Sequence, residues 1–140
     1  MLLEDTITDA LIAQARKARE QAYAPYSGFK VGAEVMGGSG SVYTGCNVEN
    51  ASYGLTVCAE RTAVLKAVSE GERKITAVAI AAGEDKPAKP CGACLQVIRE
   101  FSDADDPAVI ITSSLDGSYE VSTINDYLPM PFDLEHGAGE

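Results

Sequence analysis

The chain has 140 residues, and its 21 Asp and Glu side chains against 11 Lys and Arg give a formal charge of −10. Residues 1–99 carry 11 acidic and 11 basic side chains, whereas residues 100–140 carry 10 acidic side chains and no Lys or Arg. This charge argues against bulk electrostatic binding of nucleic acid or of an anionic membrane, and a hydrophobic content of 46% argues against disorder.

The first third of the chain predicts a helix followed by a β-hairpin. Apolar residues recur at helical spacing over 7–22, and Thr6 with Asp9 resembles a capping box at the start of this helix. Two strands are expected over 30–36 and 42–48, on either side of a glycine-rich turn. The basic residues of the helix, Arg16, Lys17 and Arg19, are most simply explained as a solvated face.

Alternating helices and strands are predicted for the rest of the chain. In chain order these are a helix over 58–70, a buried strand over 75–82, a helix that begins at Pro90, a buried strand over 108–112, a weaker edge strand over 119–122 and a short helix over 124–127. This order predicts an α/β layered domain with one mixed sheet. Residues 1–132 are expected to form a single domain, and residues 133–140 an acidic tail that frays.

The four cysteines, Cys46, Cys58, Cys91 and Cys94, are candidates for metal binding or catalysis, because disulfides are rare in a reducing compartment. The pair Cys91 and Cys94 alone would fit half of a zinc ribbon, a redox pair or two ordinary cysteines. A structural zinc ion takes four protein ligands, whereas Cys58 with this pair supplies the three that a catalytic zinc ion with an open position needs. Cys46 is best explained as a small buried residue of a strand.

The positions of these cysteines on the predicted helices suit a metal site. Cys58 and Cys91 fall at helix starts, where free N–H groups and the helix dipole lower the pKa of a thiol. Because residues two apart on a helix point in different directions, Cys58 is expected at the N-cap and Glu60 in the first turn. A carboxylate there can move protons beside the metal. Three thiolates leave excess negative charge, and Arg61 is the candidate to offset it by donating to a thiolate.

A polar pair follows the second predicted strand. Strand alternation places Asn47 and Glu49 on one face and Cys46 and Val48 on the side that faces the core. An amide beside a carboxylate suits two neighbouring hydroxyl groups of a ligand, although an ordinary solvated strand face would show the same spacing.

Several segments together resemble the cytidine deaminase family. Cys58-Ala-Glu60 followed by Pro90-Cys-Gly-Ala-Cys94 is similar to the zinc-deaminase signature in its three-cysteine form. Residues 23–33 and 45–55 resemble the nucleoside-binding segments of the small members, and 128–132 resembles their C-terminal segment, which ends in an aromatic residue.

The resemblance implies a three-layer α/β/α fold around a mixed five-stranded sheet, and a homotetramer with shared active sites. It implies one Zn²⁺ per subunit held by Cys58, Cys91 and Cys94, with Glu60 as the proton shuttle. The implied substrate contacts are Phe29, Asn47, Glu49, Tyr53, Ala59 and, from a neighbouring subunit, Phe132.

The implied reaction is hydrolytic deamination of cytidine and deoxycytidine to uridine and deoxyuridine with release of ammonia, as in pyrimidine salvage. Glu60 would take a proton from the attacking water, pass it to ring N3 and carry a second proton to the departing amino group. A carboxylate at Glu49 would repel a phosphate, which favours a free nucleoside over a polynucleotide.

Three alternatives are compatible with parts of the pattern. Another superfamily member, such as a deaminase of nucleoside antibiotics, would share the metal ligands but differ around the ribose. A structural zinc module would need Cys46 or His136 as a fourth ligand, and Cys46 is badly directed for that role. A redox protein would cycle Cys91 and Cys94 through a disulfide.

The sequence also carries expectations about location and partners. The N-terminus is acidic and lacks the basic region of a secretory signal, and the longest apolar run, Ala77 to Ala82, is too short to span a bilayer. We expect a cytoplasmic protein whose partner is a small nucleoside, not a nucleic acid or a membrane.

Overall fold

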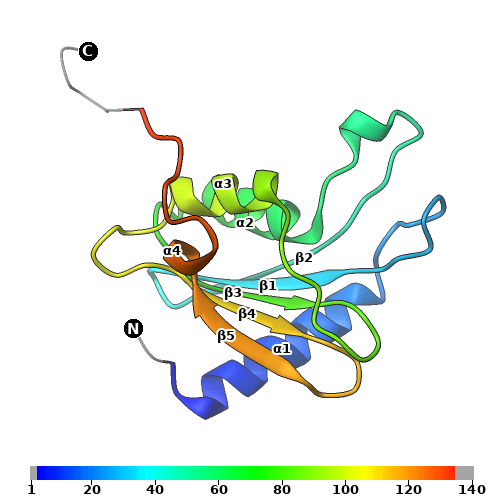
Figure 1. The fold of residues 1–140 in the computed structure, drawn as a ribbon, viewed down its shortest axis with the longest axis horizontal. Helices are drawn as coiled ribbons and strands as arrows, with labels where there is room; N and C mark the ends of the chain where they lie inside the picture. The colour runs from blue at the N-terminus through cyan, green and yellow to red at the C-terminus, as the bar shows by residue number, and fades with distance from the viewer. Residues whose placement is uncertain (1–2, 135–140) are drawn as a thin grey trace.

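A five-stranded mixed sheet with helices on both faces forms the body of the molecule (Figure 1), and the computed structural model describes residues 3–134. In chain order the elements are α1 (Asp5–Arg19), β1 (Gly32–Gly37), β2 (Val42–Cys46), the 3-10 helix η1 (Tyr53–Leu55), α2 (Ala59–Ser69), β3 (Ile75–Ala81), α3 (Gly92–Glu100), β4 (Val109–Ser113), β5 (Tyr119–Thr123) and α4 (Ile124–Tyr127). The strand order is β2-β1-β3-β4-β5, with β3 and β4 parallel and the other neighbours antiparallel. The predicted α/β fold with a mixed five-stranded sheet is confirmed.

The two faces of the sheet are covered by different helices. On one face, α1 packs Leu11 and Ala15 against Ala77, Ala79, Ala81, Val109 and Ile111. On the other face, residues of α2 and α3 pack against Ala33, Val35, Val78, Ile80 and Ile110 (Figure 1). Because β3 is covered on both sides, all of its residues except Thr76 are apolar, as expected of a central strand.

Two glycines let the helices approach the sheet closely. A Cβ atom on Gly32 would lie 2.0 Å from the carbonyl oxygen of Ala15 in α1. A Cβ atom on Gly45 would lie 2.5 Å from the Ala63 nitrogen and 2.7 Å from the Ala59 oxygen. The first turns of α2 therefore rest directly on β2, and this contact sets the position of the N-terminus of α2.

The start of α1 differs from the prediction. The N-cap is Glu4, and no side chain caps the helix. The predicted capping box of Thr6 and Asp9 is wrong, because Thr6 already lies within the first helical turn. The helix ends at Arg19, earlier than the periodicity suggested.

The end of β2 also differs from the prediction. The strand stops at Cys46, and Val48 instead forms isolated bridges to Tyr23 and Val57. The expectation that Val48 faces the core is wrong, because its side chain is exposed while that of Asn47 is buried. Pairing with two other loops thus removes residues 47–49 from the hairpin and turns Asn47 inward.

The C-terminal part of the described chain is tied to α3. Arg99 Nη2 lies 3.4 Å from Asp133 Oδ2, and Gln96 Nε2 donates to the Phe132 carbonyl at 3.0 Å. Most of the predicted frayed tail, including His136, lies outside the described residues. Within residues 3–134, none of the helices combines the length and the hydropathy that crossing a membrane requires.

We expect Gly45→Ala to lower the free energy of unfolding by about 1–3 kcal/mol, because the added methyl group must displace the backbone of α2. Gly54→Ala is the matched control, since no atom lies within 4 Å of its added Cβ, and its stability should stay within about 0.5 kcal/mol of the wild type. Urea denaturation followed by circular dichroism measures both. Equal stability of the two variants would contradict the close contact.

Candidate active site

The N-termini of α2 and α3 bring three thiols together. Cys58 is the N-cap of α2, Cys91 is the N-cap of α3, and Cys94 lies in the first turn of α3. Their sulfur atoms all lie within 4.8 Å of one another, and the Cys91 and Cys94 sulfurs are 3.3 Å apart. Cys91 Sγ also accepts a hydrogen bond from the Cys94 backbone nitrogen at 3.4 Å. The sequence-based placement of these residues at helix starts is confirmed.

The chemistry of the cluster fits a zinc ion. Tetrahedral zinc with sulfur ligands requires sulfurs about 3.8 Å apart, which three thiols grouped this closely can satisfy with little movement. Hydrogen bonding from the Cys94 thiol, and then from Arg61, lowers the pKa of the Cys58 thiol to about 5. Across residues 3–134 this is the one group of three or more His, Cys, Asp or Glu residues arranged to hold a metal, and Cys46 is not part of it.

Arg61 lies beside the thiols as its sequence position suggested. Its Nη2 atom lies 3.6 Å from the Cys58 sulfur and donates to the Thr56 carbonyl oxygen at 3.3 Å. Its Nε atom is buried and has no hydrogen-bond partner among the described residues. The guanidinium therefore adds positive charge to the thiol cluster, and its Nε–H group can still donate a hydrogen bond.

Glu60 is a buried carboxyl group next to the cluster. It lies in the first turn of α2, and its residue is only 5% exposed. Burial raises the pKa of Glu60, and the neighbouring Cys58 thiolate raises it further. A raised pKa brings a carboxyl group closer to neutral pH, which favours its use as a general acid–base residue.

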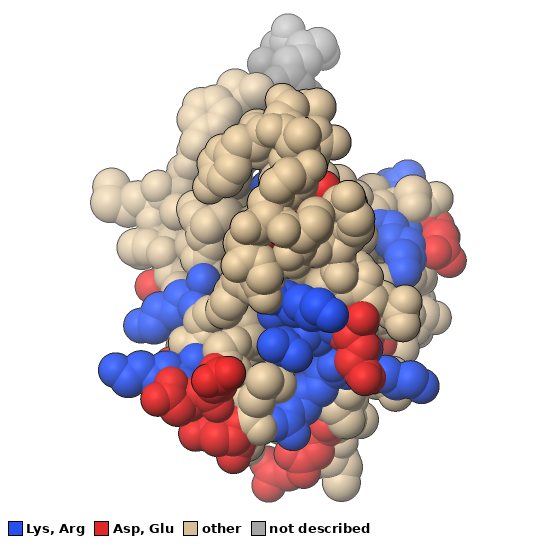
Figure 2. All heavy atoms as spheres, turned by 90° about the vertical axis from the view of Figure 1, so that its right-hand side faces the viewer, with Lys and Arg blue, Asp and Glu red and all other residues tan. Residues whose placement is uncertain are grey.

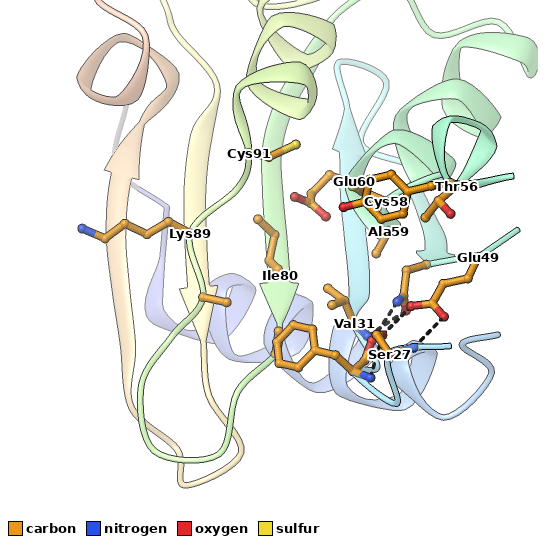
Figure 3. Close-up of a pocket in the computed structure, with 15 residues that line it drawn as sticks. Ser27, Val31, Glu49, Thr56, Cys58, Ala59, Glu60, Ile80, Lys89 and Cys91 are labelled. Atoms are coloured by element: carbon orange, nitrogen blue, oxygen red, sulfur yellow. Dashed lines mark hydrogen bonds between the residues drawn. The ribbon is translucent and has the colours of Figure 1, made fainter. Parts of the chain in front are cut away.

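A cavity of about 360 Å³ opens beside the thiols and Glu60. Its walls come from the segments 27–31, 47–49, 53–60, 80–82 and 88–91. Figure 3 shows the Glu60 carboxylate directed into the space between Cys91 and Ile80. The cavity lies at the carboxyl end of β3, a usual place for ligands in α/β proteins, and its volume suits a small molecule.

Asn47 and Glu49 both line this cavity, and both are held in place by the 26–31 loop. Asn47 is 8% exposed; its Oδ1 accepts from the Val31 nitrogen at 2.9 Å, and its Nδ2 donates to the Phe29 oxygen at 2.8 Å. Glu49 Oε1 accepts from the backbone nitrogen of Tyr26 at 2.9 Å. It also accepts from the Ser27 nitrogen at 3.1 Å, and its other oxygen accepts from the Ser27 hydroxyl (Figure 3).

These hydrogen bonds leave both side chains able to bind a ligand. The Ser27 hydroxyl is the main cause of the lowered pKa of Glu49, so this group is a carboxylate at neutral pH. Glu49 Oε1 already accepts two hydrogen bonds, but its Oε2 and Asn47 Oδ1 each accept only one and can accept a second, and the Asn47 amide nitrogen has a second hydrogen to donate. The loop therefore fixes the orientation of the pair without using all of its hydrogen-bonding capacity.

Of the other predicted substrate residues, three line the cavity and one does not. Phe29, Tyr53 and Ala59 line the cavity with Asn47 and Glu49, although Tyr53 is 90% exposed. Phe132 is 70% exposed and lies outside the cavity of its own chain. Sequence reasoning missed several lining residues, namely Ser27, Val31, Thr56, Ile80, Ala82, Ala88 and Lys89. Of these, Ser27 could have been predicted from the sequence, because its hydroxyl group lies in a loop two residues before Phe29.

Comparison with known proteins identifies the family. Residues 6–111 match the family model described as the cytidine and deoxycytidylate deaminase zinc-binding region. The chain belongs to the cytidine and deoxycytidylate deaminase family. It is a zinc-dependent hydrolase, and the Cys58, Cys91 and Cys94 cluster fits one zinc ion per subunit.

Individual relatives agree with this assignment over most of the chain. The cytidine deaminase of Sporosarcina psychrophila is 48% identical over 127 residues, covering 91% of this chain and 92% of the relative. That of Halalkalibacterium halodurans is 49% identical over 125 residues, covering 89% and 93%. The crystal structure of cytidine deaminase from Burkholderia pseudomallei superposes with a TM-score of 0.83 at 45% identity, covering 89% of this chain and 98% of that one.

We expect Cys94→Ser to abolish zinc retention, because a hydroxyl is a poor replacement for a thiolate ligand. Cys46→Ser is the matched control, since its sulfur lies outside the cluster, and it should keep one zinc ion per chain. Metal content after gel filtration, measured by atomic emission, compares them. Full zinc content in Cys94→Ser would contradict the ligand assignment.

Proposed function

We propose that this protein catalyses the hydrolytic deamination of cytidine and deoxycytidine to uridine and deoxyuridine, within pyrimidine salvage. The observation that carries the proposal is a buried Glu60 beside three clustered thiols, facing a cavity of nucleoside size. Residues 1–132 would form the single catalytic domain. The four free cysteines suit a reducing compartment, and we place the protein in the cytoplasm.

The proposed chemistry divides between the metal and the chain. Zinc held by the three cysteines supplies a Lewis acid that makes water acidic enough to react at neutral pH. Glu60 takes the proton of the attacking water and delivers it to ring N3, which makes C4 electrophilic. The hydroxide left from the water adds to C4, and Glu60 then takes the proton of the new C4 hydroxyl group and gives it to the amino group, so that the C4–N bond breaks, ammonia leaves and C4 becomes a carbonyl. Arg61 offsets the negative charge of the thiolates through its contact with Cys58.

The proposed substrate contacts use groups that already line the cavity. Asn47 and Glu49 would bind the ribose hydroxyls with the hydrogen-bonding capacity that the loop leaves open. Phe29 would pack against the nucleoside, and Ala59 would offer backbone groups to the base. Tyr53 would close the outer side of the cavity.

We further propose a homotetramer in which neighbouring subunits complete each site. The loops that flank the cavity project as a largely uncharged region, with Lys and Arg gathered below it among acidic groups (Figure 2). Six large apolar residues on these loops are exposed: Tyr23, Tyr26, Phe29, Val48, Tyr53 and Leu55. Contact with other subunits would cover such a surface and could bring Phe132 of one subunit to the cavity of the next.

Substrate choice tests the reaction directly. Cytidine and deoxycytidine should be deaminated, whereas cytosine, which lacks the ribose, and CMP, whose phosphate Glu49 would repel, should react at least about tenfold more slowly in kcat/KM. The fall in ultraviolet absorbance as the cytosine base is converted to uracil measures the rate with each compound. Inactivity toward all four compounds would refute the proposal, and equal rates with cytosine would refute the ribose contacts.

We expect Glu60→Gln to keep zinc and cytidine binding but to lower kcat by about 10²- to 10⁴-fold, because an amide cannot transfer the protons. Glu70→Gln, at the C-terminal end of the same helix, is the control and should retain wild-type kcat. Steady-state kinetics and calorimetric titration with cytidine measure both quantities. Near-normal turnover in Glu60→Gln would remove it from the mechanism.

A further inference from the structure

One wall of the cavity is the segment that connects β3 to α3. Ala82, Ala88 and Lys89 line the cavity, and the segment ends at the ligand Cys91. The Lys89 side chain points away from the other labelled lining residues, so its ammonium group does not form this part of the wall (Figure 3). The position of residues 83–89 therefore affects the width of the cavity.

Residues 83 and 84 are held by the turn between β4 and β5. The Leu115 nitrogen donates to the Gly83 oxygen at 2.9 Å, and the Asp116 nitrogen donates to the Glu84 oxygen at 3.0 Å. The two segments lie side by side at the end of the sheet (Figure 1). These two bonds extend the β3–β4 pairing beyond the strands and join the cavity wall to residues 114–118, the β4–β5 turn.

The β4–β5 turn has its own internal structure. Asp116 Oδ1 accepts from the Ser114 hydroxyl at 2.5 Å and from the Ser118 nitrogen at 2.8 Å. The Ser114 hydroxyl is the main cause that lowers the pKa of Asp116 to about 2. Gly117 supplies the positive φ, +98°, that closes the turn. These contacts make the turn rigid, so that a shift of the turn also shifts the residues hydrogen-bonded to it, Gly83 and Glu84.

Arg16 connects this turn to α1. Its Nη2 atom donates to the Ser114 carbonyl oxygen at 3.3 Å and to that of Leu115. The expectation of a solvated face is therefore wrong for Arg16, which is half-buried and reaches the end of the sheet. Leu115 receives the Arg16 bond at its oxygen and donates to Gly83 through its nitrogen. A continuous chain of hydrogen bonds thus runs from α1 to the cavity wall.

We propose that Arg16 is a positioning residue for the reaction: by holding the β4–β5 turn, it fixes the 83–89 wall of the cavity and thereby sets substrate affinity. This inference rests on the proposed cytidine deamination. Arg16 does not touch the cavity, the thiols or Glu60, so its removal should change KM and leave the chemical step and the metal intact.

The test compares Arg16→Ala, Arg16→Lys and the control Lys17→Ala, which removes the same charge from an exposed neighbouring position. Arg16→Ala should raise KM for cytidine about threefold to tenfold with kcat within about twofold of wild type, because only the bound geometry changes. Arg16→Lys should restore much of the affinity, since an ammonium can also donate to two carbonyl oxygens. Zinc content should stay at one per chain in all three.

Amide hydrogen exchange gives a second readout. In Arg16→Ala the Leu115 and Asp116 amides should lose protection, whereas Lys17→Ala should leave them unchanged. Loss of protection with an unchanged KM would overturn the inference, as would unchanged protection. An inactive wild-type enzyme would instead count against the proposed function, so the two failures are distinguishable.

A second variant perturbs the same wall from within. Gly83 has φ +84°, and a Cβ there would lie 2.3 Å from the Lys86 oxygen, so Gly83→Ala must shift the wall. It should raise KM as Arg16→Ala does. A raised KM in Gly83→Ala with a normal KM in Arg16→Ala would show that the wall matters but that Arg16 does not position it.

Discussion

The convergence of two helix N-termini on one point is the constraint on which the rest of the site depends. Three thiolate sulfurs within 4.8 Å of one another would repel each other strongly unless nearby positive charge neutralised them. The dipoles of α2 and α3 and the Arg61 guanidinium provide part of that charge, and a zinc ion bound by the three sulfurs would add its two positive charges. The close contact at Gly45 holds α2 where its N-cap can join this cluster.

Placement at a helix start also separates the roles of neighbouring residues. Cys58 at the N-cap and Glu60 in the first turn are two residues apart, yet one belongs to the thiol cluster and the other faces the cavity. Glu60 is buried and its pKa is raised, while Glu49 is held as a carboxylate by Ser27. Of the two carboxyl groups that line the cavity, Glu60 thus suits proton transfer and Glu49 suits the binding of hydroxyl groups.

Local sequence signals predicted the parts of the fold that depend on local structure. Helical periodicity and the cysteine spacing located α2, α3 and the thiols, because N-capping is decided within a few residues. The end of β2 was predicted wrongly, because Tyr23 and Val57, distant in sequence, pair with Val48. The role of Arg16 was missed for the same reason: its carbonyl partners lie about a hundred residues further along the chain, and helix periodicity contains no information on them.

Stepwise removal of zinc while cytidine deamination is followed shows whether one metal held by the three cysteines drives the reaction. Activity should fall in proportion to the zinc lost, reach zero when one ion per chain is removed, and return when zinc is added back. Full activity in zinc-free protein, or zinc loss without a proportional loss of rate, would contradict this role of the metal.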